Sequence, residues 1–218
     1  MMRRIFITGT DTEVGKTYVS VKMLEMLAAQ GRKTIALKPI ASDAKWIDDR
    51  LVNTDACALQ AAASISLPYD SVNPFVFEPA IAPHIAAIHK GVEMCVETIA
   101  RHIRQITSNS DADVMLIEGA GGLLVPINSR QTWLDLVISL ELEVIVVVGM
   151  RLGCINHALL TFEVFRSRGI QPIGWVANCL TPEVDYLQEN IEAIERHSSL
   201  PRLATVDFNA TTVDFCRW

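Results

Sequence analysis

The chain has 218 residues, of which 50% are apolar and 20% are charged, and its formal net charge is −6. This length and apolar content argue against a disordered chain and predict one domain spanning residues 1–218. The negative charge argues against a general nucleic-acid binder. The longest aliphatic run, at 144–148, is far shorter than the roughly 18–20 residues of a membrane helix. No signal-peptide core follows Met1-Met2-Arg3-Arg4. We therefore expect a cytoplasmic protein without membrane contacts.

Buried strands are indicated by short apolar runs that end at glycine, proline or polar residues, and amphipathic helices lie between them. The predicted strands cover 5–8, 34–37, 114–117, 144–148 and 173–177. The predicted helices cover about 16–30, 54–64, 92–106, 155–167 and 183–196, with Thr54 as the cap of the second. Prolines at 68, 74, 79 and 83 are expected to prevent a helix over 66–84. This stretch predicts a long surface segment that carries function or covers a site.

Continuous apolar strands alternating with helices predict an α/β fold with a mostly parallel sheet and helices on both faces. Ligands bind such sheets at the carboxyl ends of the strands. The segment 9–17 and the side chains of Lys38, Glu118 and Asn178 all follow predicted strands directly. We therefore expect all four to face one crevice.

The segment Gly9-Thr10-Asp11-Thr12-Glu13-Val14-Gly15-Lys16-Thr17 has the composition of a phosphate-binding loop between a strand and a helix. Gly15 lets the backbone approach a phosphate, Lys16 supplies positive charge, and the Thr17 hydroxyl is a ligand for Mg²⁺. Gly9 and Gly15 enclose five residues, one more than the usual pattern of this loop. The sequence thus predicts a P-loop protein that binds ATP with Mg²⁺.

The cysteines, at positions 57, 95, 154, 179 and 216, are odd in number and form no CxxC pair. A disulfide framework or a zinc site is therefore not expected. We predict buried free thiols.

Several blocks together resemble dethiobiotin synthetase. They are the phosphate loop, Lys38-Pro39, Asn53-Thr54-Asp55-Ala56, Val72-Asn73-Pro74, Glu118-Gly119-Ala120-Gly121-Gly122, Leu152-Gly153-Cys154-Ile155-Asn156-His157-Ala158 and Gly174-Trp175-Val176-Ala177-Asn178. The resemblance implies a homodimer that uses ATP and Mg²⁺ to join CO₂ to 7,8-diaminononanoate, which closes a ureido ring.

The resemblance also assigns roles to individual residues. Lys38 and Lys16 are the implied catalytic residues, and Thr17, Asp55 and Glu118 are the implied ligands of Mg²⁺. The implied ATP-binding residues are Glu13, Val14, Gly15, Lys16, Thr17, Tyr18, Asp55, Glu118, Gly119, Ala120, Gly121, Asn178 and Cys179. The implied substrate-binding residues are Thr12, Lys38, Ser42, Gly122, Gly153, Cys154, Ile155 and Asn156, the last four binding the carboxylate tail across the dimer interface.

The chain departs from the family pattern at Asp43, where glycine is usual, at Pro79, which is one position early, and at Val206-Asp207-Phe208-Asn209, where the family closes its adenine pocket. Two alternatives stay open. A related P-loop amidoligase carries a fused glutaminase domain, for which 218 residues leave no room. A degenerate paralogue that is only a dimeric nucleotide-binding protein predicts loss of Lys16, Lys38 or Glu118, and all three are present.

Overall fold

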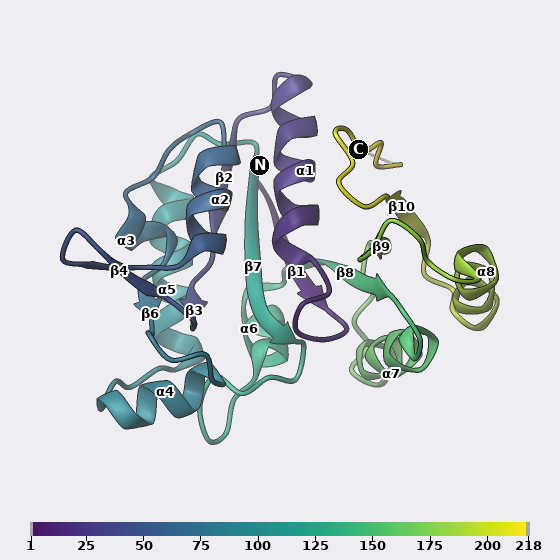
Figure 1. The fold of residues 1–218 in the computed structure, drawn as a ribbon. Coiled ribbons are helices and arrows are strands. Elements are labelled where there is room, and N and C mark those ends of the chain that lie inside the picture. The colour runs from purple at the N-terminus through teal and green to yellow at the C-terminus, as the bar shows by residue number, and fades with distance from the viewer. Residues whose placement is uncertain (1, 217–218) are drawn as a thin grey trace.

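In the computed structural model of the protein, the described residues are 2–216, so residue 1 and residues 217–218 of the expected domain lie outside the described part. A six-stranded sheet has the order β10-β9-β8-β1-β7-β2 and is parallel throughout. Its strands are β1 (Arg3–Gly9), β2 (Thr34–Leu37), β7 (Val114–Gly122), β8 (Glu143–Met150), β9 (Gly174–Cys179) and β10 (Arg202–Val206). The predicted α/β fold with a parallel sheet is confirmed (Figure 1).

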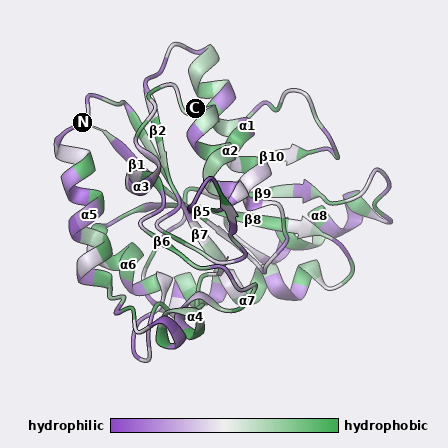
Figure 2. Cartoon of the chain, turned by 60° about the vertical axis from the view of Figure 1, so that its left-hand side comes forward, coloured by the Kyte–Doolittle hydropathy of each residue, from purple (hydrophilic) through white to green (hydrophobic). Residues whose placement is uncertain are grey.

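The helices cover both faces of this sheet. They are α1 (Lys16–Ala29), α2 (Thr54–Ala62), α3 (Tyr69–Val72), α4 (Pro83–Lys90), α5 (Val96–Ser108), α6 (Trp133–Leu140), α7 (Cys154–Ser167) and α8 (Leu187–His197). Figure 2 shows hydrophilic and hydrophobic residues alternating along α5, as expected for a helix with one buried face. Within the described residues, no helix is long and apolar enough to cross a membrane.

Alternate residues of β1, β2, β7, β8 and β9 contribute to two separate cores. On one face, Phe6 and Ile117 pack with residues of α5, α6 and α7. On the other, Ile5 and Leu116 pack with α1 and with Leu59 of α2. Both sets are buried because a parallel strand has apolar neighbours above and below it. The continuous apolar runs in the sequence have this physical origin.

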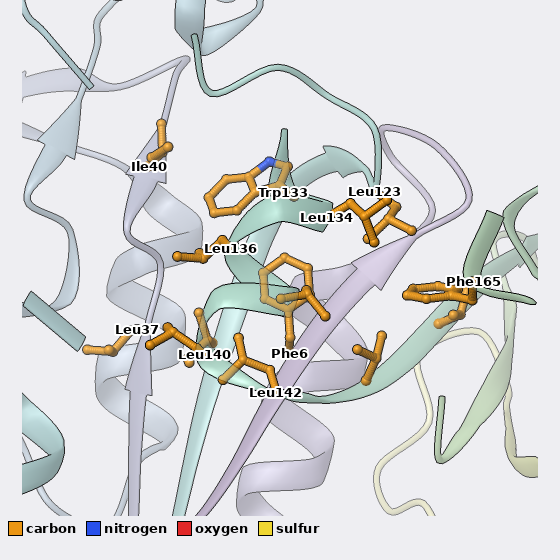
Figure 3. Packing of buried hydrophobic residues seen from close by; sticks show 14 of the residues in the cluster. Phe6, Leu37, Ile40, Leu123, Trp133, Leu134, Leu136, Leu140, Leu142 and Phe165 are labelled. Carbon is orange, nitrogen blue, oxygen red and sulfur yellow. The ribbon is translucent and has the colours of Figure 1, made fainter. Parts of the chain in front are cut away.

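Phe6 lies at the centre of the larger core. Its ring centroid is 5.6 Å from that of Trp133, and Figure 3 shows the two rings pointing toward one another among leucines of α6. The Trp133 ring nitrogen donates to the carbonyl of Ala120 at 3.0 Å. This bond fixes the end of β7 to α6, next to the segment that the sequence assigns to ATP.

Several predicted boundaries are wrong. Asn53, rather than Thr54, caps α2, because the Asn53 side chain accepts from the Ala56 N–H at 3.1 Å. The segment 66–84 contains α3 and the first residues of α4, in which Pro83 occupies the first turn, where a proline costs no hydrogen bond. The helix expected from 92 begins at Val96. Of the cysteines predicted to be buried, Cys216 is exposed and Cys57 and Cys95 are half-buried.

Two small sheets lie outside the main sheet. β3 (Ile40–Ala41) pairs in parallel with β6 (Phe75–Val76), and β4 (Lys45–Ile47) forms an antiparallel hairpin with β5 (Arg50–Val52). β3, β4 and β5 connect the end of β2 to α2, and β6 follows α3. The chain segments around residues 38, 42 and 53–55 are thereby brought to the same end of the main sheet.

Candidate active site

The phosphate loop runs from the end of β1 at Gly9 to the start of α1 at Lys16. Gly15 has a φ of 82°, and a Cβ placed on it would lie 2.1 Å from the side-chain nitrogen of Asn178. That nitrogen donates to the carbonyl of Val14 at 3.0 Å. Only glycine meets both requirements, the left-handed backbone and the close approach of a side chain. Asn178, at the end of β9, therefore supports the loop from behind.

Asp11 organises the first half of the loop through three contacts. Its carbonyl accepts from Nζ of Lys16 at 3.0 Å, and its carboxylate accepts from the N–H of Thr12 at 2.7 Å. The second carboxylate oxygen is 2.7 Å from the guanidinium of Arg151, at the end of β8. These contacts hold the Lys16 side chain over the loop, where the dipole of α1 also favours an anion.

Lys38 follows β2, and its ammonium lies between two carboxylates. Its Nζ is 2.6 Å from Oε1 of Glu118 and 3.2 Å from Oδ2 of Asp55. The same Oε1 accepts from the hydroxyl of Thr17 at 2.7 Å. Glu118 is fully buried within β7, and among the described residues its other oxygen, Oε2, has no hydrogen-bond partner. A buried carboxylate oxygen without a partner is costly, so it marks a place where a further positive group fits.

The two lysines have different electrostatic surroundings. Burial lowers the pKa of Lys16 to about 8, and the charge of Lys38 adds to this effect against the opposing effect of nearby carboxylates. Burial also disfavours the charged form of Lys38, but Glu118 and Asp55 outweigh it and raise the pKa of Lys38. Lys38 therefore stays charged, whereas the ammonium of Lys16, with its pKa of about 8, loses its proton at mildly alkaline pH in the absence of ligand.

A cleft of about 660 Å³ opens over these groups. Its polar wall carries the phosphate loop, the two lysines and the carboxylates of Asp55 and Glu118, while Ala80–Pro83 form an apolar wall opposite. The cleft contains most of the expected site residues: Thr12, Glu13, Gly15, Lys16, Thr17, Lys38, Ser42, Asp55, Glu118, Ala120 and Gly121. The volume is that of a small-molecule site. The segment predicted to cover a site, 66–84, contributes to this cleft through 80–83.

The other expected site residues lie outside the lining of this cleft. Asn178 lies behind the phosphate loop. Cys179, the last residue of β9, is buried, and burial together with the charge of Asp207 raises the pKa of its thiol. Val14 is a core side chain, and the Tyr18 hydroxyl donates to the carbonyl of Ala210 at 2.8 Å. The expected single crevice for all the strand-end groups is therefore only partly correct, since Asn178 supports the loop from the far side.

Two of the glycines at 119–122 have structural reasons to be small. A Cβ on Gly119 would lie 2.8 Å from the Phe6 ring, and Gly121 has a φ of 67° and a Cβ there would lie 2.8 Å from the Val125 side chain. A Cβ on Gly122 would make only an ordinary contact, 3.5 Å from the Gly9 carbonyl. Gly153, Cys154, Ile155 and Asn156 lie at the start of α7, away from the cleft of this chain. Within one chain, the structure does not bring the residues expected to bind the carboxylate tail to the lysines.

Sequence reasoning assigned no role to Asn53 or Arg151, both of which contact the site. Asn53 lines the cleft, and its side chain donates to the carbonyl of Ser42 at 3.0 Å. The position of Asn53 directly before Thr54 was an available signal, because asparagine is among the strongest helix caps. Arg151 gave no comparable signal, since an arginine after a strand is commonplace.

The fold and the geometry at the strand ends define a P-loop nucleotide-binding protein of the α/β class. The septum site-determining protein MinD from Pyrococcus horikoshii, solved with Mg-ADP, has the same fold, with a TM-score of 0.58 and 19% identity over 95% of this chain and 82% of that one. A family model described as an AAA domain matches residues 3–214.

Two curated relatives identify the family more closely. The ATP-dependent dethiobiotin synthetase of Pseudoalteromonas translucida is 42% identical over 97% of this chain and 92% of its own length. That of Cellvibrio japonicus is 44% identical over 94% of this chain and 89% of its own. This chain belongs to the dethiobiotin synthetase family, a family of ATP-dependent ligases.

Proposed function

We propose that this protein joins CO₂ to 7,8-diaminononanoate and closes the ureido ring of dethiobiotin, with ATP converted to ADP and phosphate. The observation that carries the proposal is the Lys38 ammonium, which lies between Asp55 and Glu118 at the edge of the phosphate loop. A permanent cation at this place meets both a terminal phosphate and a carboxylated amine. Family membership supports the same substrates.

The reaction proceeds through two successive activations of one carbon atom. One substrate amine adds to the carbon of CO₂ and loses a proton, giving a carbamate. A carbamate oxygen attacks the γ-phosphorus of ATP and ADP leaves, giving a carbamic–phosphoric anhydride. The second amine then attacks the anhydride carbon, loses its proton and releases phosphate, which closes the ring. Each step forms or moves negative charge on oxygen atoms, so the protein acts mainly by positioning anions and stabilising them.

The two lysines divide this task. Lys16, held by the Asp11 carbonyl, neutralises the β- and γ-phosphates. Lys38 holds the carbamate oxygen against the γ-phosphorus, and its raised pKa keeps it charged throughout. The apolar wall at 80–83 accommodates the hydrocarbon part of the substrate. Because the cleft is partly closed to water, the Coulomb attraction between these ammonium groups and the bound anions is stronger than it would be in water.

Mg²⁺ fits the oxygens of Thr17, Asp55 and Glu118, and Glu118 has a buried oxygen to spare. The described residues include no group of three or more acidic, histidine or cysteine ligands. Mg²⁺ needs no such group, because one or two carboxylates, a hydroxyl, phosphates and water complete its shell. When bound, it neutralises phosphate charge on ATP.

We also propose that the substrate carboxylate binds at the start of α7 of a second copy. Leu152, directly before Gly153, is fully exposed, and α7 begins at Cys154. Free N–H groups and the helix dipole at such a terminus favour a carboxylate. Because these residues lie outside the cleft of their own chain, a homodimer is the arrangement that brings a tail site to the lysines.

The test uses purified protein with ATP, Mg²⁺ and bicarbonate, with and without diaminononanoate. We expect phosphate release to depend on diaminononanoate, and mass spectrometry to detect one ureido product for each phosphate. If the rate of phosphate release is the same with and without diaminononanoate and no ureido product forms, the proposal is ruled out and a nucleotide-binding paralogue is favoured. Size measurements in solution test the dimer separately.

A further inference from the structure

The backbone of Lys38 is held by α3 rather than by the main sheet. β2 ends at Leu37, so the ladder hydrogen bonds stop one residue before Lys38. The N–H of Lys38 donates to the carbonyl of Val72 at 2.9 Å, and its carbonyl accepts from the side-chain nitrogen of Asn73 at 2.6 Å. Both backbone polar groups of Lys38, its N–H and its carbonyl, are therefore satisfied by the end of α3. Any shift of α3 moves the root of the Lys38 side chain.

Asn73 is in turn fixed by Tyr69. The Tyr69 hydroxyl donates to the side-chain oxygen of Asn73 at 2.9 Å, and the same hydroxyl oxygen accepts from the N–H of Asn53 at 2.8 Å. All three side chains are buried. Burial raises the pKa of Tyr69, so its hydroxyl remains protonated and keeps donating. This bond direction leaves each partner in one orientation.

The chain of bonds ends at the other side of Lys38. Asn53 caps α2 through the Ala56 N–H, and the first turn of α2 carries Asp55. The carboxylate of Asp55 returns to Nζ of Lys38 at 3.2 Å. The hydrogen bonds of Asn73, Tyr69 and Asn53 thus hold the backbone of Lys38 and also the helix turn that carries Asp55, whose carboxylate faces the Lys38 ammonium.

We propose that Tyr69 and Asn73 are positioning residues, which act on the reaction through Lys38 and Asp55. Neither residue lines the cleft, so neither touches a substrate. The inference rests on the proposed function, because it takes Lys38 as the group that holds the carbamate. It adds a set of buried contacts behind the site that determines where the Lys38 ammonium lies.

Tyr69→Phe tests the inference with the smallest change, the loss of one oxygen. We expect kcat for ring closure to fall about 10- to 100-fold, because a shift of about 1 Å in a positioning group has that effect. The KM for ATP is expected to change less than about twofold, because the phosphate loop is built from β1 and α1. Gln60→Met is the matched control. Gln60 bonds the Leu67 carbonyl at 2.6 Å and so ties the same loop to α2 outside the chain of bonds. It should keep the wild-type kcat.

A second measurement follows Lys38 directly, without turnover. NMR of protein labelled with ¹³C at the lysine ε-carbon, assigned through Lys38→Met, reports the surroundings of this ammonium. We expect Tyr69→Phe to shift the Lys38 signal and Gln60→Met to leave it in place. An unchanged Lys38 signal in Tyr69→Phe overturns the positioning role, whether or not kcat falls, because the effect would then not pass through Lys38. Unchanged ring closure in Lys38→Met overturns the role of Lys38 in holding the carbamate, whereas a wild-type protein that forms no ureido product overturns the proposed function.

Because Tyr69 reaches the Lys38 carbonyl through Asn73, the effects of the two substitutions are expected to overlap. Asn73→Leu keeps the approximate size of the side chain and removes the donor to the Lys38 carbonyl. For the double variant Tyr69→Phe/Asn73→Leu, we expect a kcat within about twofold of the kcat of the less active single variant. Losses that multiply instead overturn a common route through Asn73.

Discussion

The ammonium of Lys38 and the carboxylate of Glu118 meet at 2.6 Å, and both side chains are buried. Removing one partner of such a pair leaves an uncompensated buried charge, which is more costly than the loss of an exposed ion pair. The pair is joined to the phosphate loop through Thr17. It therefore links the reacting charges to the nucleotide-binding charges, and the first two predictions concern its two members.

Lys38→Met is expected to lower the rate of ring closure by about 100- to 1,000-fold, the usual effect of losing one fixed charge at a reacting oxygen. Nucleotide binding should persist, because the contacts of Lys16 remain. Measured kcat and ATP affinity check the two expectations separately. Lys45→Met, at an exposed lysine of the β4–β5 hairpin, is the control. Equal rates for both variants would contradict the role of Lys38.

Glu118→Gln keeps the size of the side chain and one acceptor oxygen but removes the negative charge and the second acceptor oxygen. We expect the Mg²⁺ concentration for half-maximal turnover to rise at least about tenfold, because the charge of the ligands sets the affinity for this ion. Titration of Mg²⁺ at saturating ATP provides the measurement. Glu141→Gln, on the loop after α6, provides the comparison. An identical Mg²⁺ requirement in Glu118→Gln would exclude Glu118 as a ligand.

Lys16 is expected to make ATP binding dependent on pH. In the free protein its pKa is about 8, and bound phosphates raise it, since they favour the ammonium. Below that pH the lysine is charged in both states, so affinity is constant. Above it only the bound state holds the proton, and the Kd for ATP should rise by up to about tenfold per pH unit. Calorimetry on both sides of the free-protein pKa tests this. Lys16→Arg, which keeps its charge, should lose this pH dependence, and a sloping profile there would assign it to another group.

Gly15→Ala and Gly31→Ala form a matched pair. Both glycines have a positive φ, 82° and 76°, but a Cβ at Gly31 meets nothing within 4 Å, whereas one at Gly15 meets Asn178. Each substitution carries the backbone strain of about 1–3 kcal/mol. Only Gly15→Ala is expected also to displace Asn178 and to weaken ATP binding. Unfolding by denaturant and ATP affinity distinguish the two contributions, and equal ATP affinity in both variants would refute support of the loop by Asn178.

The sheet could be predicted because each central strand is buried on both faces. Runs such as 144–148 are then apolar without interruption. The glycine that follows this run predicts the strand end to within two residues, since β8 ends at Met150. Burial also explains why α6 is not predicted from the sequence. Its segment Trp133–Leu140 is nearly all apolar, and five of its eight residues are buried. Such a helix lacks the polar stripe by which periodicity detects helices. The hairpin of β4 and β5 is exposed or half-buried, so no apolar pattern marks it.

The candidate site divides in the same way. Lys38 and Glu118 could be predicted because strand ends of a parallel sheet converge. The bond from Asn73 to the Lys38 carbonyl could not, because its partners are 35 positions apart and the contact depends on where α3 packs. Asn178 shows a third case. Its place at a strand end is as predicted, yet its side chain faces the back of the phosphate loop. This direction depends on how the ends of β1, β8 and β9 are offset from one another along the sheet.

The bond between Asn178 and Val14 spans 164 positions. During synthesis the phosphate loop leaves the ribosome long before β9 exists, and the partial chain lacks the side chain that fills the space behind Gly15. We expect nascent chains that end before β9 to bind nucleotide poorly, although their glycine–lysine–threonine segment is complete. Nucleotide affinity would then appear late in synthesis, and its appearance would indicate that β9 has paired with β8, next to β1.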